Sequence, residues 1–191
     1  ANKHITTGEG GMVVTNDKKI YEKCLLLRNI YFNDKRRFKH FGLGWKYRLT
    51  NLQSSLGIAQ LNQLSKFIKI KKRIGNYYYK KLSHLKSVYN PIKKLKYCEN
   101  VYWVYGLVFK KNSKHNLETI RKKLLKKGIE TRNFFWPLNK QPILMKMGYF
   151  KNKKFPISEY ISKDGFYIPS GLALKRKDQD YVIKEICELL D

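Results

Sequence analysis

Apolar residues recur at helical spacing in several parts of the chain, and the longest such stretch lies before its midpoint. Thr50 and Gln53 have the spacing of a capping box, in which the threonine side chain accepts a hydrogen bond from the Gln53 amide. The residues that then recur on or near one face are Leu52, Leu56, Ala59, Leu64, Phe67, Ile70 and Ile74. This pattern predicts one long helix that continues past Tyr77–Tyr79 and ends before Pro91.

The residues before this helix predict shorter elements. Ile5–Thr15 is β-prone at both ends and glycine-rich in the middle, which predicts two short strands around a turn. Asn16-Asp17 offers an N-cap for a helix that runs to about Asn29. Periodicity is lost from Tyr31 to Tyr47, so this segment is predicted to be a loop.

The second half of the chain has the pattern of a small α+β domain of about 100 residues. Val88–Asn100 is the best candidate boundary before it. The predicted order is strand, helix, strand, strand, helix. The predicted strands are Val101–Phe109, Ile129–Trp136 and Phe166–Pro169. The first predicted helix begins at the cap Asn116 and ends at Gly128. The second begins at the cap Asp178 and has Val182, Ile186 and Leu189 on its apolar face.

Composition adds a strong positive charge, with a formal net charge of +27. The basic residues are 33 Lys and 8 Arg, and the lysines are spread along the whole chain. Nucleic-acid recognition favours arginine for its bidentate fork, so solvated lysine surfaces are the preferred explanation. Weak, salt-dependent binding of polyanions is expected as a side effect. A basic nucleic-acid-binding module, with its lysines gathered on one face, is kept as an alternative.

Cysteines and histidines give no metal signature. Cys24, Cys98 and Cys187 lie far apart without a CxxC pair, which predicts free thiols in a reducing, cytoplasmic compartment. The four histidines are equally scattered, so no metal site is expected. Apolar runs such as Val101–Phe109 are far shorter than the roughly 20 residues of a membrane helix.

Short motifs alone do not identify an activity. The chain has neither a Walker loop nor a GxSxG motif. Gly8-Glu9-Gly10-Gly11 could cradle a phosphate, although a simple turn explains it better.

Longer blocks resemble one family. The segment Asn2–Asp17 is similar to the cofactor-lysine segment of the DegT/DnrJ/EryC1/StrS sugar aminotransferases. The resemblance continues, in the family's order and over nearly the whole chain, through Leu27–Asn29, Arg36–Phe38, Gly44–Gln53, Thr131–Leu138, Gln141-Pro142 and Phe166–Leu172.

This resemblance implies a fold, a cofactor and a reaction. The fold is α/β of the pyridoxal-phosphate-dependent aspartate-aminotransferase type (fold type I). Residues 1–60 would end the large cofactor domain, 61–88 form a long connecting helix, and 89–191 form the small C-terminal domain. Lys3 matches the lysine that bonds to pyridoxal 5′-phosphate and then acts as base and acid. The implied reaction moves an amino group from glutamate to a keto-sugar nucleotide for surface polysaccharide such as O-antigen, and the blocks look nearest to members that make GDP-perosamine.

The resemblance also suggests further site residues in a homodimer whose active sites lie at the interface. The loop at Gly44–Arg48 would reach the neighbouring subunit's cofactor phosphate, with Lys46 where the family usually has Asn. Arg36, Arg37 and Arg48 are candidates for the substrate diphosphate, with surface ion pairs as the alternative. Arg132 and Asn139 match a segment near the sugar, where the family usually has His in place of Asn139 and Pro in place of Asn133. Asparagine cannot titrate near neutral pH as histidine can.

The blocks cover only the later half of the family's chain. The earlier half would supply a carboxylate for the pyridine nitrogen, a side chain stacked on the ring and further phosphate ligands. The 191 residues alone are therefore expected to bind the cofactor poorly and to catalyse nothing. A non-catalytic or regulatory homologue of the same fold is the alternative that Lys46 and Asn139 favour.

Overall fold

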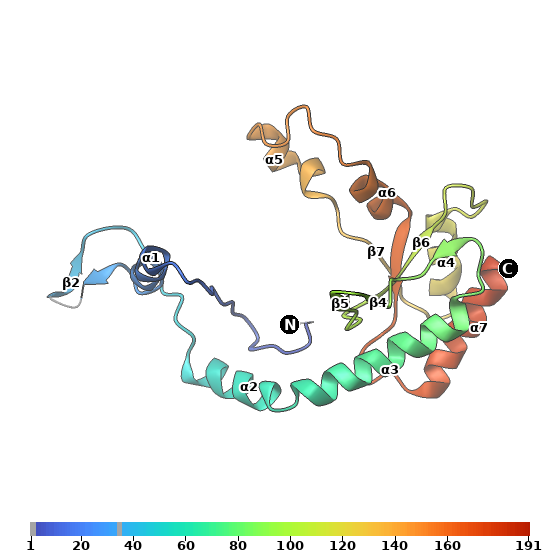
Figure 1. The fold of residues 1–191 in the computed structure, drawn as a ribbon, viewed down its shortest axis with the longest axis horizontal. Coiled ribbons are helices and arrows are strands. Elements are labelled where there is room, and N and C mark those ends of the chain that lie inside the picture. The colour runs from blue at the N-terminus through green and yellow to red at the C-terminus, as the bar shows by residue number, and fades with distance from the viewer. Residues whose placement is uncertain (1–2, 34–35) are drawn as a thin grey trace. The chain divides into compact units, whose positions relative to one another are not determined.

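A computed structural model describes residues 3–33 and 36–191, apart from the side chains of residues 33, 36 and 37 (Figure 1). The chain divides into two compact units, Ala1–Ser65 and Lys66–Asp191. The assignment of residues 1–60 to a large cofactor domain stays a prediction.

The first unit contains two helices and a small hairpin. Helix α1 spans Lys18–Arg28, and the Asp17 side chain accepts hydrogen bonds from two backbone amides of its first turn, which confirms the predicted N-cap. Strands β1 (Phe32–Asn33) and β2 (Arg36–His40) pair antiparallel, so the prediction of an irregular loop from Tyr31 to Tyr47 was wrong in its first half. Helix α2 spans Asn51–Leu61, and the predicted capping box of Thr50 and Gln53 is present.

Two other predictions for this unit were wrong. Ile5–Thr15 forms no strand, because within the described residues no neighbouring strand pairs with it. The long helix is interrupted, since α2 ends at Leu61 and α3 (Leu64–Leu82) begins two residues after Asn62. Asn62 keeps right-handed helical dihedrals (φ −60°, ψ −22°), and neither a glycine nor a proline signals the end of α2.

The second unit is built on a four-stranded antiparallel sheet. Its strand order is β3 (Val88–Tyr89), β6 (Tyr105–Phe109), β8 (Gly165–Ile168) and β7 (Arg132–Asn133). Helix α4 (Leu117–Lys126) follows β6, and α7 (Arg176–Leu190) follows β8, as predicted, but the helices that lie between β7 and β8 were not predicted. Asn116 caps α4 as predicted, and Gly128 follows that helix with φ +75°.

Several boundaries in this unit differ from the predictions. The predicted strand from Val101 begins only at Tyr105, because Tyr102 has a positive φ of 51° that interrupts extended backbone. The predicted strand Ile129–Trp136 is limited to Arg132–Asn133. Helix α7 begins at Arg176, so Asp178 lies in its first turn instead of capping it, where its negative charge still favours the helix dipole.

One face of the sheet carries the hydrophobic core. Alternate β6 residues Tyr105, Leu107 and Phe109 are buried, as the period of a strand requires. They belong to one cluster with buried side chains of α3, α4 and α7, which lie together beside the sheet (Figure 1). The helical members of this cluster are Ile74, Tyr78, Leu82, Ile120, Leu124, Val182, Ile183, Ile186 and Leu190.

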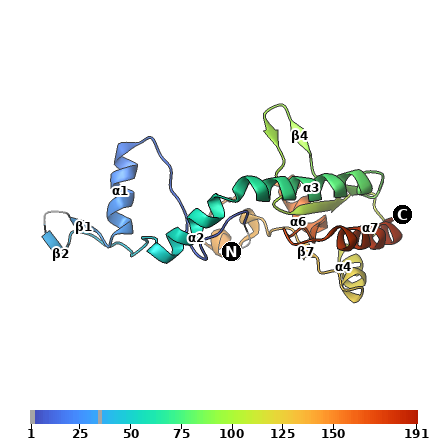
Figure 2. The ribbon, with the colours of Figure 1, turned by 90° about the horizontal axis from the view of Figure 1, so that it is seen from below.

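Smaller elements complete the unit. Between β7 and β8 the chain forms a 3-10 turn (Leu138–Lys140) and helices α5 (Pro142–Lys146) and α6 (Pro156–Asp164). Strands β4 (Lys94–Leu95) and β5 (Cys98–Glu99) form a hairpin that stands out beside α3 (Figure 2). An ion pair of 2.6 Å between Lys72 Nζ and Glu99 Oε2 joins this hairpin to α3. Among the described helices, none has the length and apolarity to cross a membrane.

Candidate active site

The segment that follows Lys3 lies against helix α2. The Thr6 amide donates to Gln60 Oε1 at 3.2 Å, and the Gln53 side-chain amide donates to the Glu9 carbonyl at 3.3 Å. Both glutamines come from α2, on which they lie seven residues apart and so on one face. The helix therefore fixes the backbone on both sides of Thr7, four residues after Lys3.

A glycine allows this close approach. A Cβ atom on Gly57 of α2 would lie 2.9 Å from Thr7 Cγ2, closer than such atoms come in folded proteins. Gly8 has φ +82°, a conformation that glycine adopts without strain. Gly8 thus serves the turn, and Gly57 allows its packing on α2, which agrees with the simpler explanation of the Gly8–Gly11 run.

Lys3 itself is exposed within the described chain. Its primary amine is the group that can bond to an aldehyde, so the chemistry of this residue fits pyridoxal phosphate. Burial would favour the uncharged amine that this chemistry needs, and the described residues do not bury Lys3.

The loop Gly44–Arg48 is fixed against the end of α1. Trp45 donates its amide to the Leu27 carbonyl at 2.6 Å, and the Tyr47 amide donates to the Arg28 carbonyl at 3.0 Å. Asn29 and Lys46 form an antiparallel bridge between these contacts. A Cβ on Gly44 would lie 2.7 Å from the Tyr31 amide nitrogen and 2.9 Å from the Leu27 carbonyl oxygen, so only glycine fits there.

Two aromatic and two basic residues alternate in the sequence of this loop. The rings of Trp45 and Tyr47 stack with centroids 5.9 Å apart. Lys46 and Arg48, the basic residues, are both exposed. Two neighbouring cations suit a phosphate or diphosphate group.

One buried polar atom near this loop has no partner. The Asn29 Oδ1 atom is buried and accepts no hydrogen bond from the described residues. Such an atom is costly to leave unpaired and is uncommon in folded proteins. It marks the Asn29–Lys46 bridge as a place where a donor from outside the described chain would be favourable.

The side chains of Arg36 and Arg37 lie outside the described residues. Their backbone belongs to β2, where Arg36 is paired with Asn33. Their proposed contact with a diphosphate stays a prediction.

In the second unit, Arg121 of α4 organises the segment that contains Arg132. Its guanidinium donates to Thr131 Oγ1 at 3.1 Å, to the Thr131 carbonyl at 2.8 Å and to Asn133 Oδ1 at 2.5 Å. Arg132 is exposed and forms an ion pair of 3.2 Å with Glu130. The sequence patterns did not single out Arg121. On α4 it lies four residues before Leu125, which is exposed, so both residues lie on the side of the helix that faces away from the core.

The aromatic residues after Arg132 cover the second face of the sheet. Phe134 lies so close to Gly106 and Gly165 that a Cβ on either glycine would come within 2.2 Å of the ring. Phe135 stacks between Trp103 and Tyr167, with centroid distances of 5.7 Å and 6.3 Å. Beside these rings lies a hollow of about 680 Å³, lined by Phe134, Phe135, Lys154, Phe155, Pro156, Ile157, Ser158, Ile161 and Ser162.

Asn139 has a structural partner. Its side-chain amide donates to Glu159 Oε1 at 2.8 Å, and Lys140 Nζ lies 3.3 Å from the other carboxylate oxygen. Partial desolvation raises the pKa of Glu159, but these two donors outweigh it and hold that pKa below its usual value. The bond to Glu159 uses one of the two N–H donors of the Asn139 amide, so the second N–H and the carbonyl oxygen remain to meet a substrate.

The predicted site residues therefore fall into two groups. Lys3, Lys46 and Arg48 belong to the first unit, and Arg132 and Asn139 belong to the second. Each group is ordered by contacts within its own unit.

Comparison with known proteins identifies the class of protein. Residues 1–187 match the DegT/DnrJ/EryC1/StrS aminotransferase family. GDP-perosamine synthase of Escherichia coli O157:H7 is 35% identical over 187 residues, which are 98% of this chain and 49% of the relative. EpsN of Bacillus subtilis, a putative pyridoxal phosphate-dependent aminotransferase, is 29% identical over 98% of this chain and 48% of its own length.

Structural comparison gives the same fold. Helicobacter pylori PseC, an aminotransferase involved in pseudoaminic acid biosynthesis, superimposes with a TM-score of 0.86 at 21% identity, covering 98% of this chain and 50% of PseC. The chain belongs to the DegT/DnrJ/EryC1/StrS aminotransferase family. The predicted family, its α/β fold type I and its cofactor, pyridoxal phosphate, are confirmed. The chain spans about half the length of the curated relatives it matches.

Proposed function

We propose that the full-length protein transfers an amino group from glutamate to a keto-sugar nucleotide, with GDP-4-keto-6-deoxymannose as the first substrate to test. The observation that carries this proposal is the match of residues 1–187 to the aminotransferase family, with GDP-perosamine synthases among its relatives. The product would be a 4-amino-4,6-dideoxy sugar for surface polysaccharide. The proposed working form is a cytoplasmic homodimer.

Each candidate residue has a task in this proposal. The Lys3 amine would hold pyridoxal phosphate by its aldehyde, while Lys46 and Arg48 would supply positive charge to phosphate groups. When bound, the cofactor withdraws electrons from the substrate carbon that carries the nitrogen and so makes its C–H bond acidic. Lys3 Nζ would take the proton from that carbon as a base and return a proton as an acid.

The contacts around Thr7 support this assignment. A base that must take a proton and return it needs a fixed position within hydrogen-bond reach of the reacting atom. The two glutamine hydrogen bonds and the Gly57–Thr7 contact fix the backbone close to Lys3. This proposal requires that Lys3, which is exposed in the described chain, be covered in the full-length dimer.

Lys3→Arg tests the assignment, because arginine keeps the positive charge but cannot bond to the aldehyde. We expect the rate of glutamate-dependent amination by the full-length protein to fall by ~10²–10⁴-fold, the usual contribution of a general acid–base group. Lys19→Arg, at an exposed position on α1, is the matched control and should leave the rate unchanged. The product is measured by mass spectrometry of the sugar nucleotide.

Borohydride reduction provides a second readout. It should attach the cofactor to the peptide that contains Lys3 and to no other lysine. Full amination by Lys3→Arg, or a label on another lysine, would disprove the assignment. A labelled Lys3 without amination of any keto-sugar nucleotide would instead favour the non-catalytic homologue.

A further inference from the structure

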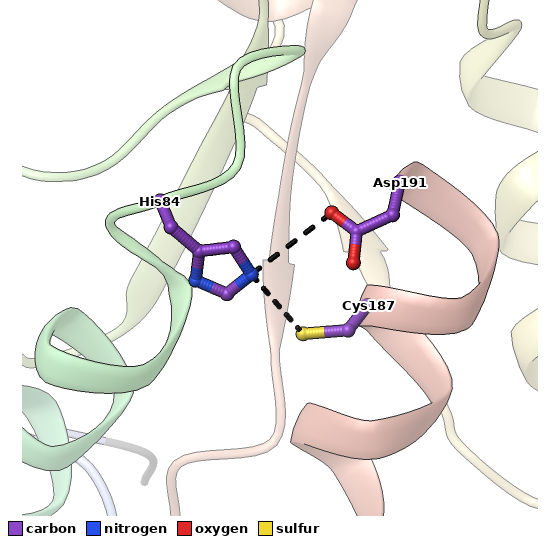
Figure 3. A group of neighbouring side chains, drawn as sticks. All are labelled: His84, Cys187 and Asp191. Atoms are coloured by element: carbon purple, nitrogen blue, oxygen red, sulfur yellow. Dashed lines mark hydrogen bonds and ion pairs between the residues drawn. The ribbon is translucent and has the colours of Figure 1, made fainter.

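Three potential metal ligands that lie far apart in the sequence meet at one end of the second unit (Figure 3). His84 follows α3, while Cys187 lies on α7 and Asp191 follows that helix. His84 Nε2 is 3.9 Å from Asp191 Oδ1 and 4.0 Å from Cys187 Sγ. The nitrogen, sulfur and oxygen atoms all lie within 4.8 Å of one another.

The backbone that carries these side chains is fixed by the core. Cys187 and Asp191 are four residues apart, which places them on one face at the end of α7. Their neighbours Ile186 and Leu190 are buried, as are Leu82 and Leu85 on either side of His84. The Ser87 hydroxyl also donates to the Leu190 carbonyl at 3.3 Å, which ties the turn after α3 to the end of α7.

From this arrangement we propose that His84, Cys187 and Asp191 bind a borderline-soft divalent metal ion such as Zn²⁺, with water in a fourth position. Imidazole, thiolate and carboxylate are the ligands that zinc takes in proteins, whereas Ca²⁺ and Mg²⁺ prefer oxygen alone. Thiolate and carboxylate together carry two negative charges, which balance the charge of the ion. None of these three residues is among those assigned to amino-group transfer.

The distances are close to those that a bound ion requires. Zinc–ligand bonds of about 2.0–2.3 Å in a tetrahedron place the three donor atoms about 3.4–3.6 Å apart. The observed 3.9 Å and 4.0 Å from His84 Nε2 exceed this by about half an ångström, and the Cys187 and Asp191 donor atoms lie within 4.8 Å of each other. The side chains of His84 and Asp191 are 58% and 61% exposed, so small rotations can bring their donor atoms inward.

Binding exchanges a proton for the metal. As the S–Zn bond forms, the Cys187 thiol loses its S–H proton to solvent, and no atom changes oxidation state. Burial, with a smaller contribution from the negative charge of Asp191, raises the pKa of the Cys187 thiol. Lys86, Lys110 and Lys114 line the adjoining hollow of about 590 Å³, so the two anionic ligands must also offset nearby positive charge.

The prediction of no metal site rested on the cysteines and histidines, which show no metal-ligand spacing along the chain. His84 and Cys187 are 103 residues apart and meet only because α3 and α7 pack on the same face of the sheet. Their spacing along the chain therefore carries no signal.

Cobalt binding to the full-length protein tests the proposal. Co²⁺ replaces Zn²⁺ in such sites, and a tetrahedral cobalt thiolate has intense visible bands. We expect these bands to saturate at one equivalent of Co²⁺ per chain, to disappear on addition of Zn²⁺, and to be absent in Cys187→Ser. Cys98→Ser, at an exposed cysteine outside the cluster, should behave as the wild type.

The two exposed ligands provide variants that spare the core. His84→Gln and Asp191→Asn should each raise the Co²⁺ dissociation constant by more than ~10-fold, the lower limit for loss of even an outer partner of a metal ligand. Zn²⁺ should also slow alkylation of Cys187, but not of Cys98, when both peptides are followed by mass spectrometry.

The outcomes are decisive and do not depend on aminotransferase activity. Absence of saturable visible bands from the wild type, or bands that persist in Cys187→Ser, would overturn the proposal. If Cys187→Ser does not fold, unchanged Co²⁺ affinity in both His84→Gln and Asp191→Asn would overturn it equally.

Discussion

At the scale of single residues, Lys71 is a lysine of the second unit whose side chain is buried. It lies on α3, is only 6% exposed, and donates to the carbonyl and the hydroxyl of Ser170. Burial lowers the pKa of its amine from 10.5 to about 8. Lys71 thus joins α3 to Ser170, which belongs to Phe166–Leu172, one of the blocks by which the sequence resembles its family.

The lowered pKa of Lys71 makes the stability of the protein depend on pH. Between pH 8 and 10.5 the unfolded chain holds the Lys71 proton more tightly than the folded one, so the free energy of unfolding should rise with pH. Below pH 8 the charged amine is present in both states and the cost of burying it is fully felt. We expect the free energy of unfolding to rise by at most ~3 kcal/mol between pH 8 and 10.5 because of Lys71.

The variant Lys71→Met isolates the contribution of Lys71 titration to the free energy of unfolding. The difference in free energy of unfolding between wild type and variant, measured by urea denaturation from pH 7 to 10, should shift in favour of the wild type as pH rises. Tyr78, whose pKa burial raises, titrates in both proteins and cancels in the difference. Two curves that stay parallel over this range would show that Lys71 is not desolvated as described.

At the scale of elements, glycines decide how closely helices and strands approach. A glycine inside a helix usually costs ~1 kcal/mol relative to alanine. Alanine would not be more favourable than Gly75 in α3, because its Cβ atom would lie 2.2 Å from Tyr102 Cγ. Tyr102 is itself buried and held by a hydrogen bond from its amide to Asn100, so its ring has little freedom to move away.

Gly75→Ala should therefore destabilise the protein by ~1–3 kcal/mol, the usual cost of overpacking, despite the better helix propensity of alanine. Lys80→Ala, on an exposed position of the same helix, should change stability by less than ~0.5 kcal/mol. Thermal unfolding of both variants measures the contrast. A Gly75→Ala variant as stable as the wild type would mean that Tyr102 is displaced at little cost.

Elements whose signals are local were predictable from sequence. Asp17, Thr50 and Asn116 cap their helices with their own side chains, so the cap, the turn and the apolar face all lie within a few residues. Strands depend on partners that sequence patterns do not reveal. This is why Ile5–Thr15, with suitable residues but no described partner strand, was wrongly predicted as two strands.

The candidate site residues also divide into those that a sequence pattern indicated and those that it did not. Lys3, Lys46, Arg48, Arg132 and Asn139 came from blocks that resemble a family, and their roles stay predictions. Arg121 and the His84–Cys187–Asp191 cluster carried no pattern, because their partners come from other elements. Physical contact across the fold was needed to find them.

At the scale of the whole molecule, the first unit exposes many large apolar side chains. Helix α2 has no buried residue, and Leu52 on it is 83% exposed. Exposed fractions of 60–91% occur at Met12, Val13, Val14, Leu43 and Ile58. Extensive exposed apolar surface marks sites of interaction. Since the chain spans about half of its relatives' length, we propose that the rest of the polypeptide and a second subunit cover this surface.

The 191 residues produced alone provide the last test of this view. We expect them to bind an apolar dye such as ANS strongly and to label Lys3 with pyridoxal phosphate and borohydride no more than other exposed lysines, because Lys3 is exposed in the described chain and exposure favours the charged amine. The full-length protein should bind less dye per chain and label at Lys3. The core of the second unit, which is contained within residues 66–191, should give the short chain a cooperative unfolding transition, so poor labelling would not reflect general misfolding. Efficient labelling of Lys3 in the short chain would show instead that the contacts of Thr6, Thr7 and Glu9 with α2 are enough to form the cofactor site.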